Sequence, residues 1–388
     1  MPLSDVKHQP HAHRLIQQAI GRQRVPHAYI FHGPGGVGRA MMARGLAELL
    51  LCERPTEQRL AGDGVDKAGA ESFRSGCGRC EDCRAVDADV HPDLHRIHRH
   101  LHREHPDADV RQRKGLDLGV DVLRHFVIDR VGLTPARGRA KVFIIEEADR
   151  MNPQAQNAVL KTLEEPPGPT FLILLVTALD RLLPTTRSRC QLVRFDALPS
   201  AFVVAKVAEQ CPALPAEQVT WYAQVGAGSI GDAVRAAGDE LYELNQRVLD
   251  GFASLAAESD RFDVAKTWTE EAKELGERYR KHDSEISDAE ATRRALKTIF
   301  QLAAVWYADL LRTGSGQSPV IVNLGAAARI QQAADRVDAE QAAEAIKRIA
   351  AAERQLDLNV NTQLCVECLV NDLHQFGGCP TSLEVGER

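Results

Sequence analysis

The sequence predicts an α/β domain followed by an all-α region. Up to Leu198 and Pro199, short apolar runs alternate with helix-like patterns, whereas beyond this point the strand signal disappears and long, Ala-rich helical patterns follow. Strands that alternate with helices indicate a parallel sheet with both faces covered. A chain of 388 residues is long enough for two or three domains.

The expected strands are the apolar segments 28–31, 93–97, 141–145, 171–176 and 190–195. Between them we expect helices at 39–51, at 120–131 and at 153–163, the last with Asn152 as its N-cap. After the sheet we expect short helices at 201–210, at 216–224 and after Ser229, and then long ones that include 289–311 and 339–356. The segments 55–76 and 91–109 look irregular.

The overall composition excludes several classes of protein. With 44% apolar and 26% charged residues, the chain is not expected to be disordered. It has no apolar run long enough to span a bilayer and no apolar signal sequence at its start, so we expect a cytoplasmic protein without membrane association. A formal net charge of −6 argues against a general nucleic-acid binder.

A glycine-rich loop follows the first expected strand and has the frame G-x-x-x-x-G-K-[ST] of a phosphate-binding loop. Its candidate phosphate-contacting residues are Gly33, Gly35, Gly36, Gly38 and Arg39. Arg39 stands in place of the lysine that reaches the phosphates, and Ala40 has no oxygen for Mg²⁺. We therefore expect the loop to keep its shape and to present a helix N-terminus to an anion, but to be a poor ATPase with doubtful ATP binding.

An acidic motif follows the strand at 141–145, where an acidic pair of an active ATPase would hold Mg²⁺. The residues are Glu146, Glu147 and Asp149, and the first is one methylene longer than the usual aspartate. Two interpretations stay open from the sequence: a metal site or its relic, and solvated acids at the end of a strand.

Four cysteines are spaced like zinc ligands. Cys77, Cys80 and Cys83 form a tight knuckle with two residues between ligands, and Cys52 supplies a fourth thiolate before an insertion at 53–76. Four thiolates make a closed tetrahedral site, which predicts structural Zn²⁺ and no metal catalysis. The alternative is a reduced cluster without metal.

Two other groups of residues, a cysteine pair and a run of histidines, could in principle bind metal, but neither is interpreted as a metal site. Cys365 and Cys368 lie in an apolar helical run, which favours buried cysteines on a helix face. The stretch 91–105 holds six histidines and could bind metal, since His98, His100 and His102 would share a face in an extended segment. A solvated polar loop is the favoured interpretation of the whole stretch.

Two sequence stretches carry a family resemblance. The run NAVLKTLEEPP at 157–167 and the run TTRSRC at 185–190 resemble the clamp-loader branch of the AAA+ ATPases. Together with the altered phosphate loop and the four cysteines, they resemble the delta-prime subunits of bacterial DNA polymerase III. The segments 306–311 and 354–369 resemble the collar helices of this family, although Ala308 stands where an arginine is common.

This resemblance implies a domain organisation and a set of partners. It implies an AAA+ module at 1–197 with a zinc-binding knuckle inserted at 52–83, a three-helix lid at 198–240 and a helical collar at 241–388 that joins five subunits in a ring. It also implies partnership with gamma/tau and delta subunits, which together place a sliding clamp on primed DNA. The chain would be a component of a DNA polymerase holoenzyme and not catalytic alone.

The resemblance also assigns a role to Arg189, in the triplet Ser188-Arg189-Cys190. The matching arginine in clamp loaders reaches the γ-phosphate of ATP held by the neighbouring subunit, where a guanidinium stabilises the transition state. The alternative is an ordinary surface arginine. For Thr177, after the strand at 171–176, two interpretations stay open: the remnant of a phosphate-sensing residue and a cap at a strand end.

Two other functions remain as alternatives. One is a self-contained AAA+ ATPase with a variant phosphate loop, in which Arg39 replaces lysine and Glu146 replaces aspartate. The other is a zinc-bearing DNA-binding module, against which the acidic net charge counts.

Overall fold

A computed structural model describes residues 3–59, 72–113, 115–137, 139–256, 261–314, 321–358 and 360–376. The chain forms two compact units, Met1–Pro199 with Gly228–Gly231, and Ser200–Ala227 with Asp232–Arg388. Within the described residues, no helix combines the length and the apolar character needed to cross a membrane.

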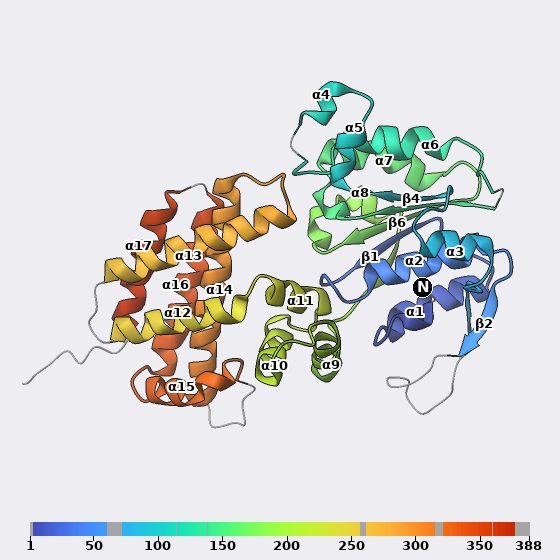
Figure 1. Ribbon diagram of the computed structural model, residues 1–388. Helices are drawn as coiled ribbons and strands as arrows, with labels where there is room; N and C mark the ends of the chain where they lie inside the picture. Colours follow the sequence, from blue (N-terminus) through green and yellow to red (C-terminus); the bar gives the residue numbers. More distant parts are fainter. Residues whose placement is uncertain are drawn as a thin grey trace, which may run out of the picture. The chain divides into compact units, whose positions relative to one another are not determined.

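The first unit is built on a five-stranded sheet (Figure 1). Its strands are β1 (Ala28–His32), β4 (Leu94–Ile97), β5 (Lys141–Ile145), β6 (Thr170–Val176) and β7 (Gln191–Arg194). They pair in the order β4-β5-β6-β1-β7, and every pairing is parallel. The predicted parallel α/β sheet is therefore confirmed, and the carboxyl ends of all five strands meet at one edge.

Helices cover both faces of this sheet, as its apolar strands require (Figure 1). On one face, α5 (Val120–Leu123), a π-helical stretch at Arg124–Ile128, α6 (Asp129–Val131) and α7 (Pro153–Glu164) pack in one apolar core with the strands. On the other face lies α2 (Arg39–Leu51), which contacts β1, β5 and β6. Asn152 caps α7 as expected, because its side chain accepts the N–H of Ala155 at 2.8 Å.

The expectation of an irregular segment at 55–76 is wrong at both of its ends. There β2 (Thr56–Arg59) and β3 (Ser72–Ser75) pair as antiparallel strands, while residues 60–71 lie outside the described part. The side-chain amide of Gln17, in α1 (Pro10–Gly21), accepts the N–H of Arg74 at 2.8 Å and donates to its carbonyl oxygen at 3.0 Å. The amide thus provides the hydrogen bonds that a neighbouring strand would otherwise provide to the backbone of Arg74 in β3. The apolar pattern of the sequence gives no sign of this contact.

The interpretation of the histidine-rich segment as a solvated loop is wrong for His91 and His102, which are 4% and 5% exposed. The segment contains β4, a 3-10 turn at Arg99–Glu104 and the short helix α4 (Ala108–Arg111). Because the chain turns after Ile97, the alternate histidines at 98, 100 and 102 do not share an extended face.

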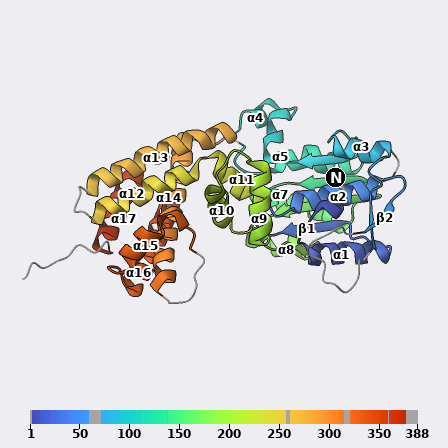
Figure 2. The ribbon, with the colours of Figure 1, turned by 60° about the horizontal axis from the view of Figure 1, so that its bottom comes forward.

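The second unit is all-α, as the loss of strand signal predicted (Figures 1 and 2). Its shorter helices are α9 (Ser200–Gln210), α10 (Ala216–Val225), α11 (Ile230–Gly238, which begins in the first unit) and α15 (Ala327–Ala334). Its long helices are α12 (Leu241–Ala256), α13 (Arg261–His282), α14 (Asp288–Gly314), α16 (Ala339–Asp357) and α17 (Thr362–Phe376). The pairs α13–α14, α14–α16, α16–α17 and α17–α13 all pack together, so these four helices close into a bundle.

Aromatic side chains fill the joint between α12 and this bundle. The Phe252 ring stacks on Trp306 with 5.9 Å between centroids and meets Trp268 and Tyr307 edge to face. On α17, Cys365 is buried as expected, but Cys368 is exposed, so the prediction of two buried cysteines is wrong for the second. Their spacing of three residues lies at the limit of a helix face and lets one side chain turn to solvent.

A buried carboxylate organises the polar interior of the second unit. Asp309 on α14 is fully buried and accepts the backbone N–H groups of Val322 and Asn323, each at 3.0 Å. The Asn323 side chain in turn accepts N–H bonds from Trp221 at 3.2 Å and from Asn245 at 2.8 Å. One network therefore joins α10, α12 and α14 to the segment that follows α14 in the chain.

We expect Asp309→Ala to lower the free energy of unfolding of the second unit by about 2–4 kcal/mol, because two backbone donors lose their acceptor in a buried place. Urea denaturation followed by far-UV circular dichroism measures this change. Asp335→Ala, at an exposed position after α15, is the matched control and is expected to stay within about 0.5 kcal/mol. A variant at position 309 as stable as this control would contradict the role of the network.

Candidate functional site

The phosphate loop lies between β1 and α2, at the sheet edge where the strands end. At Gly36 the backbone has φ +63°, and a Cβ there would lie 2.3 Å from the backbone nitrogen of Gly231. At Gly33 a Cβ would lie 2.3 Å from the carbonyl oxygen of Phe195. Both positions therefore require glycine, and the loop has the tight backbone that its sequence predicted.

Positive charge gathers at this loop, but the oxygen that would hold Mg²⁺ is missing. Arg39 is the first residue of α2, and Ala40 is exposed where a working loop carries a hydroxyl. The pKa of His32, at the end of β1, lies below its usual value because the ring is partly buried and because Arg194 and Arg39 are nearby. Arg194 is itself paired with Asp196 at 2.8 Å, and Ala40 offers no side-chain oxygen to a metal ion.

The acids after β5 are held by arginines. Glu146 Oε1 accepts Nε and Nη2 of Arg96 at 2.8 and 2.6 Å. Glu147 has φ +48° and pairs with Arg99 and Arg150, with N–O distances of 3.1 Å each. The structure therefore shows Glu146 and Glu147 paired with guanidinium groups, neither fully solvated nor free for a cation.

Thr177 forms a third part of this edge. Its hydroxyl donates to Asp149 Oδ2 at 2.6 Å, and the N–H of Ala178 reaches the same oxygen at 3.3 Å. The end of β6 is therefore tied to the acidic motif after β5. The hydroxyl is engaged in this contact.

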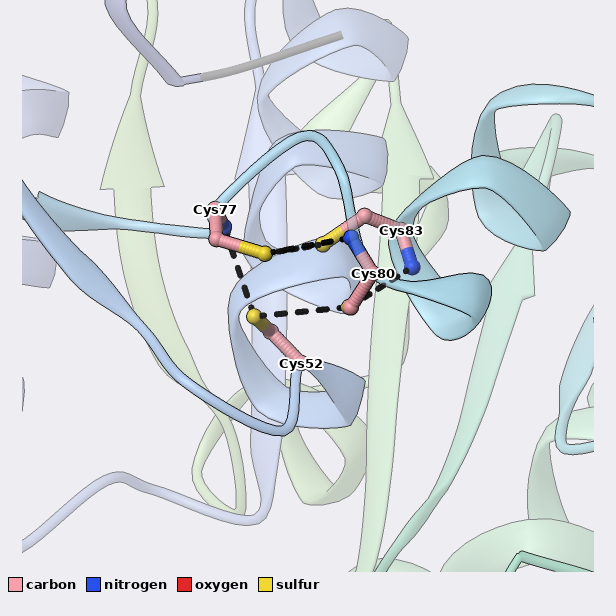
Figure 3. Close-up of side chains that lie close together, drawn as sticks. All are labelled: Cys52, Cys77, Cys80 and Cys83. Atoms are coloured by element: carbon pink, nitrogen blue, oxygen red, sulfur yellow. Dashed lines mark hydrogen bonds between the residues drawn. The ribbon is translucent and has the colours of Figure 1, made fainter.

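The four cysteines come together at the junction of three segments (Figure 3). Cys52 follows α2, Cys77 follows β3, and Cys80 is the N-cap of the short helix α3 (Glu81–Asp87), which contains Cys83. All four sulfur atoms lie within 4.8 Å of one another. The long insertion between the first and second cysteine does not separate them, because β2 and β3 form its two arms and return the chain to its starting point.

This geometry fits a tetrahedral metal. The Cys52–Cys80 and Cys77–Cys83 sulfur pairs are both 3.9 Å apart, and a tetrahedral zinc with bonds of about 2.3 Å places its sulfurs about 3.8 Å apart. Backbone N–H groups of Cys77, Cys80 and Cys83 point at cysteine sulfurs at 3.3–3.4 Å. Such donors stabilise thiolates, so the cluster has the ligands and the polar support of a structural metal site.

The ionisation of the thiols agrees with this assignment. Burial by itself would raise the pKa of Cys77, but N–H groups of Arg79 and Cys80 and the neighbouring thiols lower it to about 6. Burial raises the pKa of Cys52 and of Cys83. The cluster therefore combines one thiol whose pKa is lowered with two buried thiols whose pKa values are raised.

An outer ring of polar contacts fixes the cluster to the sheet. Asp82, between two of the cysteines, is buried and accepts Arg137 Nε at 2.9 Å, and His91 Nε2 lies 3.3 Å from the same oxygen. Arg139 donates to the carbonyl oxygen of Cys52 at 3.0 Å. The short loop before β5 therefore holds the cluster from two sides.

Arg189 lies after the short helix α8 (Pro184–Arg187), and 30% of its side chain is exposed. Its Nε donates to Glu164 Oε1 at 2.6 Å, Nη2 contacts the same oxygen, and Nη1 donates to the carbonyl oxygen of Thr185 at 2.9 Å. Its neighbour Arg187 is exposed. The structure thus places Arg189 at the surface in a defined conformation, away from the cysteine cluster.

Sequence reasoning missed the partners that hold these groups. Arg99 lies in the segment 91–109 that looks irregular in the sequence, and Arg96 lies in the expected strand at 93–97, where the apolar pattern says nothing about its partner. Arg137 and Asp82, which brace the cysteines, are isolated charges in the sequence. The sequence places two acids, Glu81 and Asp82, between Cys80 and Cys83, and nothing in it marks Asp82 as the buried one.

A phosphate loop between a parallel strand and a helix, an acidic motif after a neighbouring strand and an arginine triplet define a protein of the AAA+ class. The family described as "DNA polymerase III, delta subunit" matches residues 8–199. The subunit delta' of DNA polymerase III from Pseudomonas aeruginosa is 33% identical over 246 residues, which is 63% of this chain and 66% of the relative. The delta' subunit from Bacillus subtilis is 29% identical over 202 residues, which is 52% of each chain.

The chain belongs to the delta-prime family of DNA polymerase III, in the clamp-loader branch of the AAA+ proteins. Its alignments span about two thirds of the length of the first relative and about half of the second. A solved gamma subunit-related protein from Thermotoga maritima covers 93% of this chain and 99% of its own, with 15% identity. Its TM-score of 0.39 is too low to add to the assignment.

Proposed function

We propose that this chain is the clamp-loader subunit that does not hydrolyse ATP itself and supplies Arg189 to the ATP site of a neighbouring gamma/tau subunit. The observation that carries the proposal is a contrast within one unit. The arginine of the Ser188-Arg189-Cys190 triplet is partly exposed at the surface. In contrast, the phosphate loop has Ala40 where a hydroxyl would bind Mg²⁺, and the carboxylate of Glu146 is paired with Arg96. Phosphoryl transfer needs all of these parts in place at once.

The same proposal includes the partners and the domains. Gamma/tau and delta subunits complete the complex, which loads a sliding clamp on primed DNA during replication in the cytoplasm. We assign 1–197 to the AAA+ module, the short helices at 198–240 to a lid, and 241–388, with its closed bundle, to the collar that joins the subunits. The chain acts as a component of the polymerase holoenzyme and not as a catalyst alone.

We further propose that Cys52, Cys77, Cys80 and Cys83 hold one structural Zn²⁺. A closed set of four thiolates leaves no open position for water or substrate, so the metal would hold α2, β3 and α3 together and take no part in hydrolysis. The sulfur spacing and the N–H donors support zinc over a free thiol cluster.

The isolated chain is expected to turn over no ATP and to bind ATP only weakly, because nothing at the loop replaces the hydroxyl ligand of Mg²⁺. Isothermal titration with Mg-ATP and a steady-state phosphate-release assay measure both properties. Micromolar binding together with steady hydrolysis would favour the alternative of a self-contained ATPase with Arg39 in the role of lysine.

Arg189→Ala is expected to leave folding and assembly intact and to slow hydrolysis in the one ATP site that it faces by about 10³-fold or more. The clamp- and DNA-stimulated turnover of the reconstituted complex should therefore drop sharply. Arg187→Ala is the matched control, since it removes an exposed arginine two residues away. Full stimulated turnover by the complex with the first variant would refute the trans-acting role.

Metal analysis of the purified chain is expected to find about one zinc per chain. Cys80→Ser should abolish this content and lower the melting temperature, because the remaining thiols cannot close the site. Cys368→Ser, at an exposed position outside the cluster, is expected to keep both zinc and stability. A metal-free preparation that is equally stable would show that the cluster works without a metal.

A further inference from the structure

The segment that carries Arg189 is fastened to α7 at two points, and the first is a buried amide. Gln156 is 1% exposed, and all of its hydrogen-bonding capacity is used. Its Nε2 donates to the carbonyl oxygens of Met151 and Arg181 at 3.0 and 3.1 Å, and its Oε1 accepts the N–H of Leu183 at 2.7 Å and the hydroxyl of Thr186 at 3.3 Å. The backbone before Arg189 is therefore fixed to the helix.

The second point is Glu164, the last residue of α7, which holds the guanidinium itself. One carboxylate oxygen takes the Nε–Nη2 edge of Arg189, and the carbonyl oxygen of Thr185 takes one N–H of Nη1. Each terminal nitrogen of a guanidinium carries two N–H bonds. Within the part of the chain that the structure describes, these contacts leave one further N–H on each of Nη1 and Nη2, and a phosphate binds such N–H groups of a guanidinium in pairs.

We propose that Glu164 is a positioning residue for Arg189: it holds the Nε edge of the guanidinium so that the terminal nitrogens are presented to a phosphate in a neighbouring subunit. This inference rests on the proposed trans-acting role of Arg189. Glu164 touches neither nucleotide nor metal in this scheme, and it acts only through the arginine.

The physical basis is the entropy of a long side chain. An exposed arginine samples many rotamers, and fixing it at the moment of catalysis costs free energy. An ion pair at the surface adds little to stability by itself, but one that selects the reactive conformation in advance removes part of this cost. Glu164 is half exposed, so its contact with Arg189 is not required to satisfy a buried charge.

The test uses the complete complex reconstituted with the ATP-hydrolysing gamma/tau subunits, and it compares Glu164→Ala with the neighbouring exposed Glu165→Ala. We expect Glu164→Ala to lower stimulated turnover at saturating ATP about fivefold, the factor that corresponds to the upper range of an exposed ion pair, with KM for ATP unchanged. Glu164→Gln keeps one oxygen acceptor and is expected to recover about half of the lost rate. Glu165→Ala should match the unmodified complex.

The double variant Glu164→Ala/Arg189→Ala distinguishes positioning from a general structural effect. If Glu164 acts only through the arginine, the double variant is as slow as Arg189→Ala alone and no slower. An additional loss in the double variant, or an equal loss with Glu165→Ala, would overturn the inference.

Two further outcomes separate this inference from the function on which it rests. If Arg189→Ala is slow but Glu164→Ala has normal or increased turnover, the positioning role fails and the trans-acting arginine stands; an increase would mean that Glu164 restrains the arginine. If Arg189→Ala has normal turnover, both proposals fail together.

Discussion

The parallel sheet is the constraint on which the rest of the first unit depends. Because β1, β4, β5, β6 and β7 all run in one direction, everything that follows a strand is delivered to the same edge. The phosphate loop follows β1, the acidic motif follows β5, and Thr177 follows β6. The carbonyl oxygen of Phe195, the residue after β7, lies so close to Gly33 that no Cβ fits there, and the N–H of Phe195 donates to the carbonyl oxygen of His32 at 2.8 Å.

This edge keeps the tight backbone of a phosphate-binding loop but carries altered side chains. The tight glycine turns are intact, but the position for a hydroxyl is an alanine and the acids pair with arginines from β4 and the turn after it. Arg96 and Arg99 supply positive partners to the partly exposed Glu146 and Glu147, whereas the buried Asp149 is held by the hydroxyl of Thr177 and the N–H of Ala178. The same unit keeps an arginine at its surface, oriented by Glu164 and anchored through Gln156.

The cysteine cluster solves a different problem. Residues 52–83 leave the sheet after α2 and must return to it through β3 and α3, with few apolar side chains to bury. A metal ion bound by the four sulfurs would cross-link the start and the end of this excursion, in place of the hydrophobic core that its few apolar side chains cannot form. Arg137 and Arg139 extend the fixation to the loop before β5, so the excursion is tied to the sheet by polar contacts on two sides.

Periodicity and local motifs in the sequence determined the element types. Apolar runs predicted the five strands, and Asn152 with Pro153 predicted the start of α7. The spacing of the cysteines predicted the ligand cluster. Each of these signals is local in the sequence. The altered phosphate loop and the arginine triplet are also visible in the sequence alone. Local signals could not give the β2–β3 pairing, the burial of His91 and His102 or the exposure of Cys368.

What only the tertiary structure decided is which charges meet. Arg96 and Glu146 are 50 residues apart, Arg137 and Asp82 are 55 apart, and Arg189 and Glu164 are 25 apart. No periodic pattern connects such pairs, because their proximity follows from the order of strands in the sheet and from the packing of α7 on its face. The sequence determined which charged side chains the chain carries. The fold determined which of them pair with one another and which lie at the surface.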